Sequence, residues 1–140
     1  MLLLIMINSA IFAFISGIHV YWAIGGKWAS DAVLPTKSDG TLMLNPGLMS
    51  TLVVAGGLLI FALLTLGNLG IWDAWLSHKI IILGNWFIMG IFLLRAIGDF
   101  NYVGFFKQTK GTPFAQNDTK IYSPLCVVIG VISLIINLSS

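Results

Sequence analysis

Four long stretches of this chain are almost entirely apolar and contain no charged side chain. The charge-free stretches are residues 1–26, 40–72, 80–94 and 121–140. A helix needs about 20 apolar residues to cross the roughly 30 Å hydrocarbon core of a bilayer, and the alternation typical of strands is absent. The pattern predicts an all-α protein, a membrane-embedded four-helix bundle with antiparallel up-down-up-down topology. The predicted membrane-spanning helices cover about residues 2–24, 47–69, 76–98 and 121–139.

The distribution of positive charge predicts how this bundle lies in the membrane. Four crossings place both termini on one side and the loops 25–46 and 99–120 on the other. Most of the cations lie in or beside these two loops, whereas the side of the termini carries only Lys79. The cations near the loops are Lys27, Lys37, Arg95, Lys107, Lys110 and Lys120. The positive-inside rule therefore predicts cytoplasmic loops and external termini.

Composition supports a membrane protein and excludes several classes of function. Hydrophobic residues make up 58% of the chain and charged residues only 9%, whereas a soluble domain has about 25% charged residues. A net charge of +2 is too small for a nucleic-acid-binding face. One cysteine, Cys126, and two histidines exclude an internal disulfide and predict no metal site within one chain. We expect residues 1–140 to form a single transmembrane domain in a lipid bilayer.

Each predicted helix contributes one asparagine to the half of the membrane nearer the termini. These residues are Asn8, Asn68, Asn85 and Asn137. Because lipid offers polar groups no partners, the amides are expected to face one another inside the bundle and form a polar layer. One interpretation is that this layer only packs the helices and fixes their register. The alternative is a pocket for a polar ligand.

A second cluster is predicted at the opposite, loop end of the bundle. The first and third predicted helices run in the same direction, so their C-terminal ends lie at similar depth. This places His19 and Trp22 near Arg95 and Asp99, with Phe92 one turn deeper. Polar and ionisable side chains at membrane depth usually face the interior of a bundle. We therefore take these five residues as candidate ligand-binding residues.

Each polar member of this cluster also has a purely structural interpretation. His19 is either a neutral packed imidazole or a proton-handling, ligating side chain. Arg95 either extends to the interface as an anchor or binds an anionic or oxygen-bearing group. Asp99 lies unfavourably at the negative end of a helix dipole, which argues for a partner such as His19 or a loop lysine. Alternatively, Gly98 ends the helix and Asp99 caps the following turn.

Two blocks of sequence at these helix ends resemble a known family. The blocks are His19-Val-Tyr-Trp22-Ala-Ile-Gly25-Gly26 and Arg95-Ala-Ile-Gly98-Asp99-Phe100. They are similar to the signature of a family of small bacterial four-helix integral membrane proteins, catalogued as a domain of unknown function. The resemblance covers nearly the whole chain. It implies a four-span protein of a bacterial inner membrane and carries no activity.

Three hypotheses of function follow from the cluster. The first is a module that binds a lipid-like or quinone-like molecule, in a polar pocket at the cytoplasmic ends of the first and third predicted helices. The second is an interfacial enzyme acting on a lipid-like substrate, with His19 as acid or base oriented by Asp99. The third is a small dimeric transporter, although no acid lies near mid-membrane. The sequence specifies no cofactor, ligand identity or oligomeric state.

Overall fold

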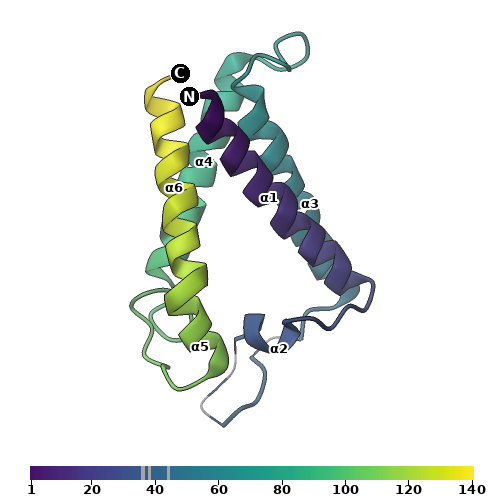
Figure 1. The fold of residues 1–140 in the computed structure, drawn as a ribbon, viewed down its shortest axis with the longest axis vertical. Coiled ribbons are helices and arrows are strands. Elements are labelled where there is room, and N and C mark those ends of the chain that lie inside the picture. Colours follow the sequence, from purple (N-terminus) through teal and green to yellow (C-terminus); the bar gives the residue numbers. More distant parts are fainter. Residues whose placement is uncertain (36, 38, 44) are drawn as a thin grey trace.

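The computed structural model describes residues 1–35, 37, 39–43 and 45–140, and the elements of this part of the chain are helices (Figure 1). Four of its helices are long and apolar enough to cross a membrane. The all-α, four-helix prediction is therefore confirmed. The long helices are α1 (Leu2–Ala23), α3 (Leu48–Gly67), α4 (His78–Ile97) and α6 (Ser123–Leu138). The short ones are α2 (Ser30–Val33), α5 (Pro113–Asn117) and the π-helix η1 (Asp118–Tyr122).

The last membrane helix begins earlier than the sequence pattern predicts. Elements α5, η1 and α6 form one continuous apolar helix of 26 residues, Pro113–Leu138. The sequence pattern predicts that this helix starts near residue 121. The Thr112 hydroxyl caps this helix by accepting a hydrogen bond from the Ala115 N–H at 3.1 Å, and Pro113 suits its first turn. The charges of Asp118 and Lys120 suggested a loop, yet both lie within the helix. Asp118 therefore enters the bundle.

Helices α1 and α3 form one closely packed pair. The Ser9 hydroxyl donates to the Ala62 carbonyl at 3.2 Å, and the Ser16 hydroxyl donates to the Ala55 carbonyl at 2.7 Å. The partners on α3 move back along the chain as the donors on α1 move forward, so these helices run in opposite directions. Alanine at both contacts lets the two backbones approach closely.

Helices α4 and α6 form the second pair. Gly130 of α6 faces α4 so closely that a Cβ atom there would lie 2.6 Å from Cδ2 of Leu93. The inner face of α6 is lined by small and polar residues, all buried: Ser123, Cys126, Gly130, Ser133 and Asn137. Small residues of this kind permit close packing between membrane helices, where the hydrophobic effect provides no driving force.

The two pairs meet near the termini and separate toward the loops. Both termini lie at the same end of the molecule (Figure 1). At that end Ile5 packs against Ile132 and Ile136, and the Asn8 amide donates to the Ser133 hydroxyl at 3.1 Å. Farther along, α1 and α6 diverge, as Figure 1 shows. The bundle is therefore closed at the terminal end and open between the pairs at the loop end.

The four asparagines occupy different environments. Asn8, Asn85 and Asn137 are buried, whereas Asn68 is half-buried and donates to the Thr65 carbonyl of its own helix. Within the described residues, both amide atoms of Asn85 and of Asn137 lack a hydrogen-bond partner. No hydrogen bond joins one asparagine to another in this part of the chain, so Asn8 contacts its neighbour helix through Ser133.

Replacing Ser16 by alanine should weaken the first helix pair. The hydroxyl is buried and bonded across helices, and an interhelical hydrogen bond in a membrane protein contributes about 0.6 kcal/mol on average. We expect a loss of that size in the free energy of unfolding, measured in mixed detergent micelles. Ser139→Ala is the control, because in the described part of the chain that hydroxyl bonds only the Ile135 carbonyl of the preceding turn. Equal stability of both variants would contradict the assigned contact.

Candidate functional site

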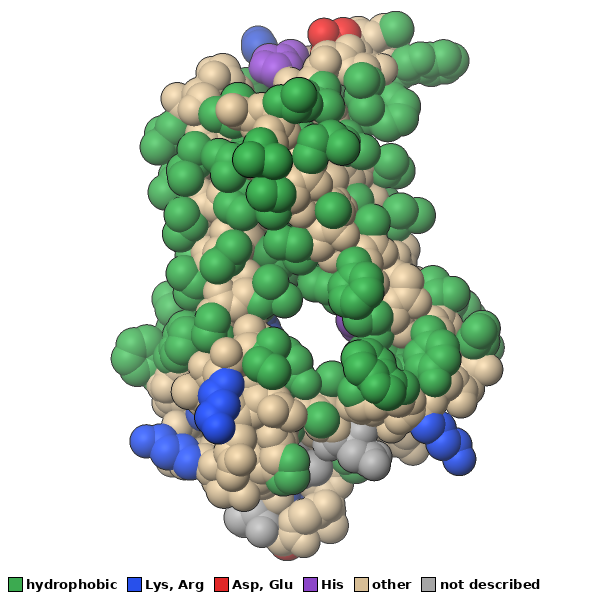
Figure 2. Space-filling view, in the orientation of Figure 1, with side chains coloured by type: hydrophobic (Ala, Val, Ile, Leu, Met, Phe, Trp, Pro, Cys, Tyr) green, Lys and Arg blue, Asp and Glu red, His purple; other side chains and the backbone are tan. Residues whose placement is uncertain are grey.

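An opening passes through the loop half of the molecule between the two helix pairs (Figure 2). Toward the termini the pairs are joined by an aromatic cluster, in which the Phe12 ring lies 5.7 Å from that of Phe61 and 5.3 Å from that of Phe92. Toward the loops, the Tyr122 hydroxyl donates to the Ala32 carbonyl of α2 at 3.1 Å. The opening is therefore closed above by aromatic rings and below by a tie between α2 and the last helix.

His19 lies near the loop end of α1 and is half-buried. Its Nδ1 atom lies 2.8 Å from the Ile15 carbonyl oxygen of the preceding turn. A carbonyl oxygen only accepts, so Nδ1 carries a proton in this arrangement, and Nε2 of the neutral ring is a hydrogen-bond acceptor. The hydrogen bond to Ile15 thus selects the tautomer of His19 and leaves Nε2 available to another partner.

Trp22 fixes the orientation of the His19 ring. The two rings meet edge-on, with centroids 5.1 Å apart and planes at 68°. The Trp22 indole N–H donates to the Trp28 carbonyl at 2.8 Å, and the chain reverses between them at Gly25, whose φ is 96°. The single polar atom of Trp22 is therefore occupied, and the side chain contributes an apolar surface next to His19.

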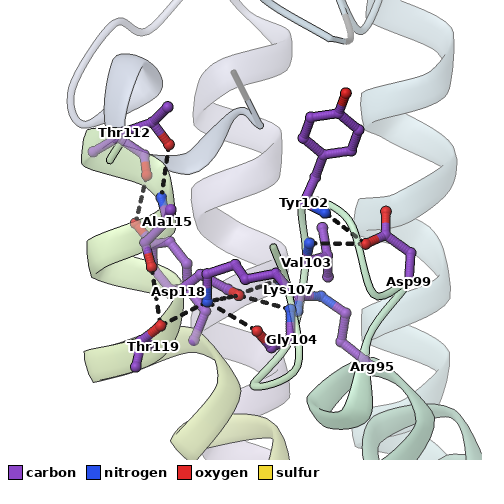
Figure 3. A network of polar contacts seen from close by, with 12 residues as sticks. Arg95, Asp99, Tyr102, Val103, Gly104, Lys107, Thr112, Ala115, Asp118 and Thr119 are labelled. Atoms are coloured by element: carbon purple, nitrogen blue, oxygen red, sulfur yellow. Dashed lines mark hydrogen bonds and ion pairs between the residues drawn. The ribbon is translucent and has the colours of Figure 1, made fainter. Parts of the chain in front are cut away.

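The main polar network of the loop end is centred on Asp118, a residue that sequence reasoning did not select. Its carboxylate is fully buried. Arg95 donates to one oxygen at 2.9 Å, while Lys107 and the Gly104 N–H donate to the other at 3.1 and 2.7 Å. Figure 3 shows these groups converging from α4, the 98–112 loop and η1. The carboxylate thus joins three segments of the chain.

Lys107 is bound inside this network and is not a free surface lysine. Only 3% of the residue is exposed. Its ammonium donates to the Gly104 carbonyl at 2.8 Å and to the Thr119 hydroxyl at 2.6 Å, besides Asp118 (Figure 3). An ammonium has three hydrogens, so its donor capacity is filled. Lys107 therefore helps the Gly104 N–H to hold the 98–112 loop against the last helix.

The network carries more positive than negative charge. Two cations, Arg95 and Lys107, share one carboxylate, which leaves a formal excess of one positive charge. The Arg95 side chain is 32% exposed, while its Nη1 atom is buried without a partner among the described residues. Unpaired charge in a partly buried site attracts anions and polar oxygens more strongly than in water.

Asp99 caps the turn that follows α4. One of its oxygens accepts hydrogen bonds from the backbone N–H groups of Asn101, Tyr102 and Val103 at 2.8–3.0 Å. Partial burial opposes ionisation, but these N–H groups outweigh it and hold the pKa of Asp99 below its ordinary value. The helix ends at Gly98, whose φ is 91°. Asp99 therefore caps the turn that follows the helix, which is the second of the two interpretations of this residue. Among the described residues, it forms no hydrogen bond or ion pair with His19 or a lysine.

The five predicted ligand-binding residues are therefore divided among separate local environments. His19 and Trp22 form one unit at the end of α1, and Arg95 belongs to the Asp118 network. Phe92 packs in the aromatic cluster at the centre of the bundle. Asp99 bonds only its own turn. In the described part of the chain, no three His, Cys, Asp or Glu side chains group closely enough to hold a metal ion.

The sequence contained one indication of the Asp118 network. Between Asp99 and the last apolar stretch, Asp118 is the only acid among three lysines, Lys107, Lys110 and Lys120. A lone acid next to an apolar run is a candidate for a buried partner. Which cations it would pair with depends on contacts between distant segments, and spacing does not reveal them.

These features define a small integral membrane protein: four apolar helices, an opening between two helix pairs, and a buried ionic network at the loop end of one pair. Residues 12–133 match the family described as "protein of unknown function (DUF3995)", and the chain belongs to that family. The match includes both of the blocks at the ends of α1 and α4. No curated protein matches the chain, and no solved structure does.

Proposed function

We propose that this protein binds a lipophilic molecule with a polar head in the opening between its helix pairs. The observation that carries the proposal is the opening itself (Figure 2). Protein interiors are close-packed, with few voids larger than a water molecule. Within a bilayer, a gap between helices is occupied by lipid or by a ligand. The divergence of α1 from α6 therefore leaves room for a lipophilic molecule.

The polar groups available at this level favour an amphipathic occupant over an ordinary acyl chain. His19 offers an acceptor nitrogen, because its other nitrogen bonds Ile15. The Arg95 side chain is 32% exposed and belongs to a network with an excess of positive charge. A hydroxyl or quinol-type head would donate to His19, and a carbonyl or anionic oxygen would accept from Arg95. Trp22 and the aromatic cluster supply apolar walls.

The proposed orientation places the polar head near the cytoplasm. Most cations of the described residues lie at the loop end, and Figure 2 shows Lys and Arg side chains gathered there. The positive-inside rule would place this end in the cytoplasm. The tail of the ligand would then point into the bilayer toward the aromatic cluster. The assignment to a bacterial inner membrane is part of this proposal.

An enzymatic or transport role receives less support. The proposed acid–base pair needs Asp99 to orient His19, and in the described residues the oxygens of Asp99 bond only backbone N–H groups of its own turn. Transport would need a polar path across the membrane, and the aromatic cluster lies across the centre of the bundle. A binding module requires neither feature.

Native mass spectrometry of gently extracted protein tests the proposal. We expect wild-type protein to retain one lipophilic molecule per chain. His19→Leu should lower its retention by up to about tenfold, which corresponds to one lost hydrogen bond. His78→Leu is the matched control, because His78 is exposed at the start of α4, at the opposite end of the bundle.

Two results would contradict the proposal. One is a wild-type protein that carries no small molecule when it is extracted under conditions that preserve the fold. The other is a retained molecule whose occupancy is the same in wild type and His19→Leu. Circular dichroism of each variant shows whether the helices are intact.

A further inference from the structure

A second, separate pocket lies on the outer side of the Asp118 network. It has a volume of about 330 Å³ and is bordered by the 98–112 loop and by the start of the last helix. Phe105 and Lys110 line it from the loop, and Gln116 and Lys120 line it from the helix. Lys107 and Thr119 form its inner wall. This pocket does not involve α1 or His19, so it is independent of the opening between the helix pairs.

Among the described residues, three lysines and no acid line the pocket. Lys110 and Lys120 are exposed, and neither forms an ion pair within the described part of the chain. The one acid nearby, Asp118, is buried behind the wall and already shared by two cations. The ammonium groups of Lys110 and Lys120 repel each other and the positively charged Asp118 network beside them. An anion bound between them would offset this repulsion. The pocket is therefore electrostatically suited to an anion.

Its position indicates what the anion is attached to. Three aromatic side chains of the same loop are exposed, Phe100 by 56%, Phe105 by 43% and Phe106 by 64%. Exposed aromatic rings next to a membrane helix are typical of segments that insert at the bilayer interface. Beyond Lys120 the helix carries no charged side chain up to its end at Leu138, so we place its entry into the membrane here. The pocket thus lies at the level of phospholipid headgroups.

We infer that this pocket binds the phosphate of an anionic phospholipid. Lys110 and Lys120 would hold the phosphate oxygens, and the Gln116 amide would add a neutral donor. Phe105 would contact the glycerol and the upper acyl chain. Basic pockets beside membrane helices recognise anionic lipid headgroups by this chemistry. Lys107 contributes only its charge, because its three hydrogens are already donated.

Lipid titration in detergent, followed by native mass spectrometry, tests the site. The probes are phosphatidylglycerol and phosphatidylcholine of the same acyl chains. Wild-type protein should bind one phosphatidylglycerol in preference to phosphatidylcholine. Each of Lys110→Gln and Lys120→Gln should weaken this binding by about fivefold, the contribution typical of one lysine near a lipid surface. Lys79→Gln is the control, because Lys79 is an exposed lysine at the opposite end of the molecule.

A parallel titration with inorganic phosphate, against chloride of equal ionic strength, separates lipid from free phosphate. Phosphate should displace the lipid no better than chloride does. Equal binding of both lipids, or unchanged phosphatidylglycerol binding in the Lys110→Gln/Lys120→Gln double variant, would overturn the inference. Displacement by phosphate alone would overturn the assignment to lipid and indicate a free-phosphate site. Within the described residues neither Lys110 nor Lys120 forms an ion pair, so neither substitution removes an ionic contact of the fold. Circular dichroism of each variant shows whether the helices are intact.

Discussion

Replacing Asp118 by alanine is expected to destabilise the protein by about 3–5 kcal/mol, the cost typical of removing one partner from a buried ion pair. The substitution leaves the Lys107 ammonium buried without its carboxylate and removes the acceptor of Arg95 and of the Gly104 N–H. The measurement is the free energy of unfolding in mixed micelles, followed by circular dichroism. Asp39→Ala is the control, because that acid is exposed and, among the described residues, its carboxylate bonds only Thr41.

A second variant distinguishes the ionic network from simple packing around Asp118. Asp118→Ala combined with Lys107→Met removes one charge of each sign and leaves only Arg95, which is 32% exposed and can reach solvent. The double variant should therefore lose less stability than the sum of the single losses, as expected for residues in one network. Strictly additive losses would contradict the network as the source of the effect.

Replacing Gly98 by alanine should have the second largest effect. Gly98 has a φ of 91° and Gly104 a φ of 89°, and the two backbones lie against each other. A Cβ atom on Gly98 would collide with the Val103 carbonyl oxygen. The left-handed backbone alone costs a non-glycine residue about 1–3 kcal/mol, and the collision adds to this. We expect lower thermal stability and weaker docking of the loop that carries Lys107.

Gly111→Ala is the matched control for this prediction. Gly111 lies in the same loop, has no positive φ, and has open space where a Cβ atom would be added. Its replacement should leave the melting temperature nearly unchanged. If Gly98→Ala proved as stable as Gly111→Ala, the tight turn after α4 would not have the geometry described.

The length and apolar character of the four helices were predictable because they follow from the thickness of the bilayer. The burial of Asn8, Asn85 and Asn137 was also expected, since polar residues of a membrane helix face its neighbours. The start of the last helix at Pro113 was not predicted. There the buried pairing of Asp118 permits a charged residue inside an apolar helix. A pattern that treats every charge as a loop residue therefore starts the helix too late.

In the candidate site, contacts within one helix were predictable from the sequence, whereas contacts between distant segments were not. The contact between His19 and Trp22 is predictable, because residues three apart share one face of a helix. The pairing of Arg95 with Asp118 joins residues 23 positions apart, and no periodicity encodes it. For Asp99 the sequence left two interpretations open. The backbone of Gly98 decides between them, because it turns the following N–H groups toward the carboxylate.

The Asp118 network also accounts for the shape of the opening. It fixes the start of the last helix against α4 and the 98–112 loop, while α1 remains packed on α3 through Ser9 and Ser16. Each pair is thus held together by its own contacts. The pairs share contacts mainly toward the termini and at the aromatic cluster, so the loop ends are left apart.

The most direct test of this account is the separation of α1 and α6 in a lipid bilayer. Pulsed electron paramagnetic resonance between two spin-labelled cysteines measures this separation at each end of the bundle. The protein is placed in nanodiscs and carries Cys126→Ala, so that only the introduced cysteines are labelled. The exposed pair Leu3 and Ile135 reports the terminal end, and the exposed pair Val20 and Ile121 reports the loop end. We expect a clearly longer distance at the loop end. Equal distances at both ends would show a bundle closed along its length, with no opening for a ligand.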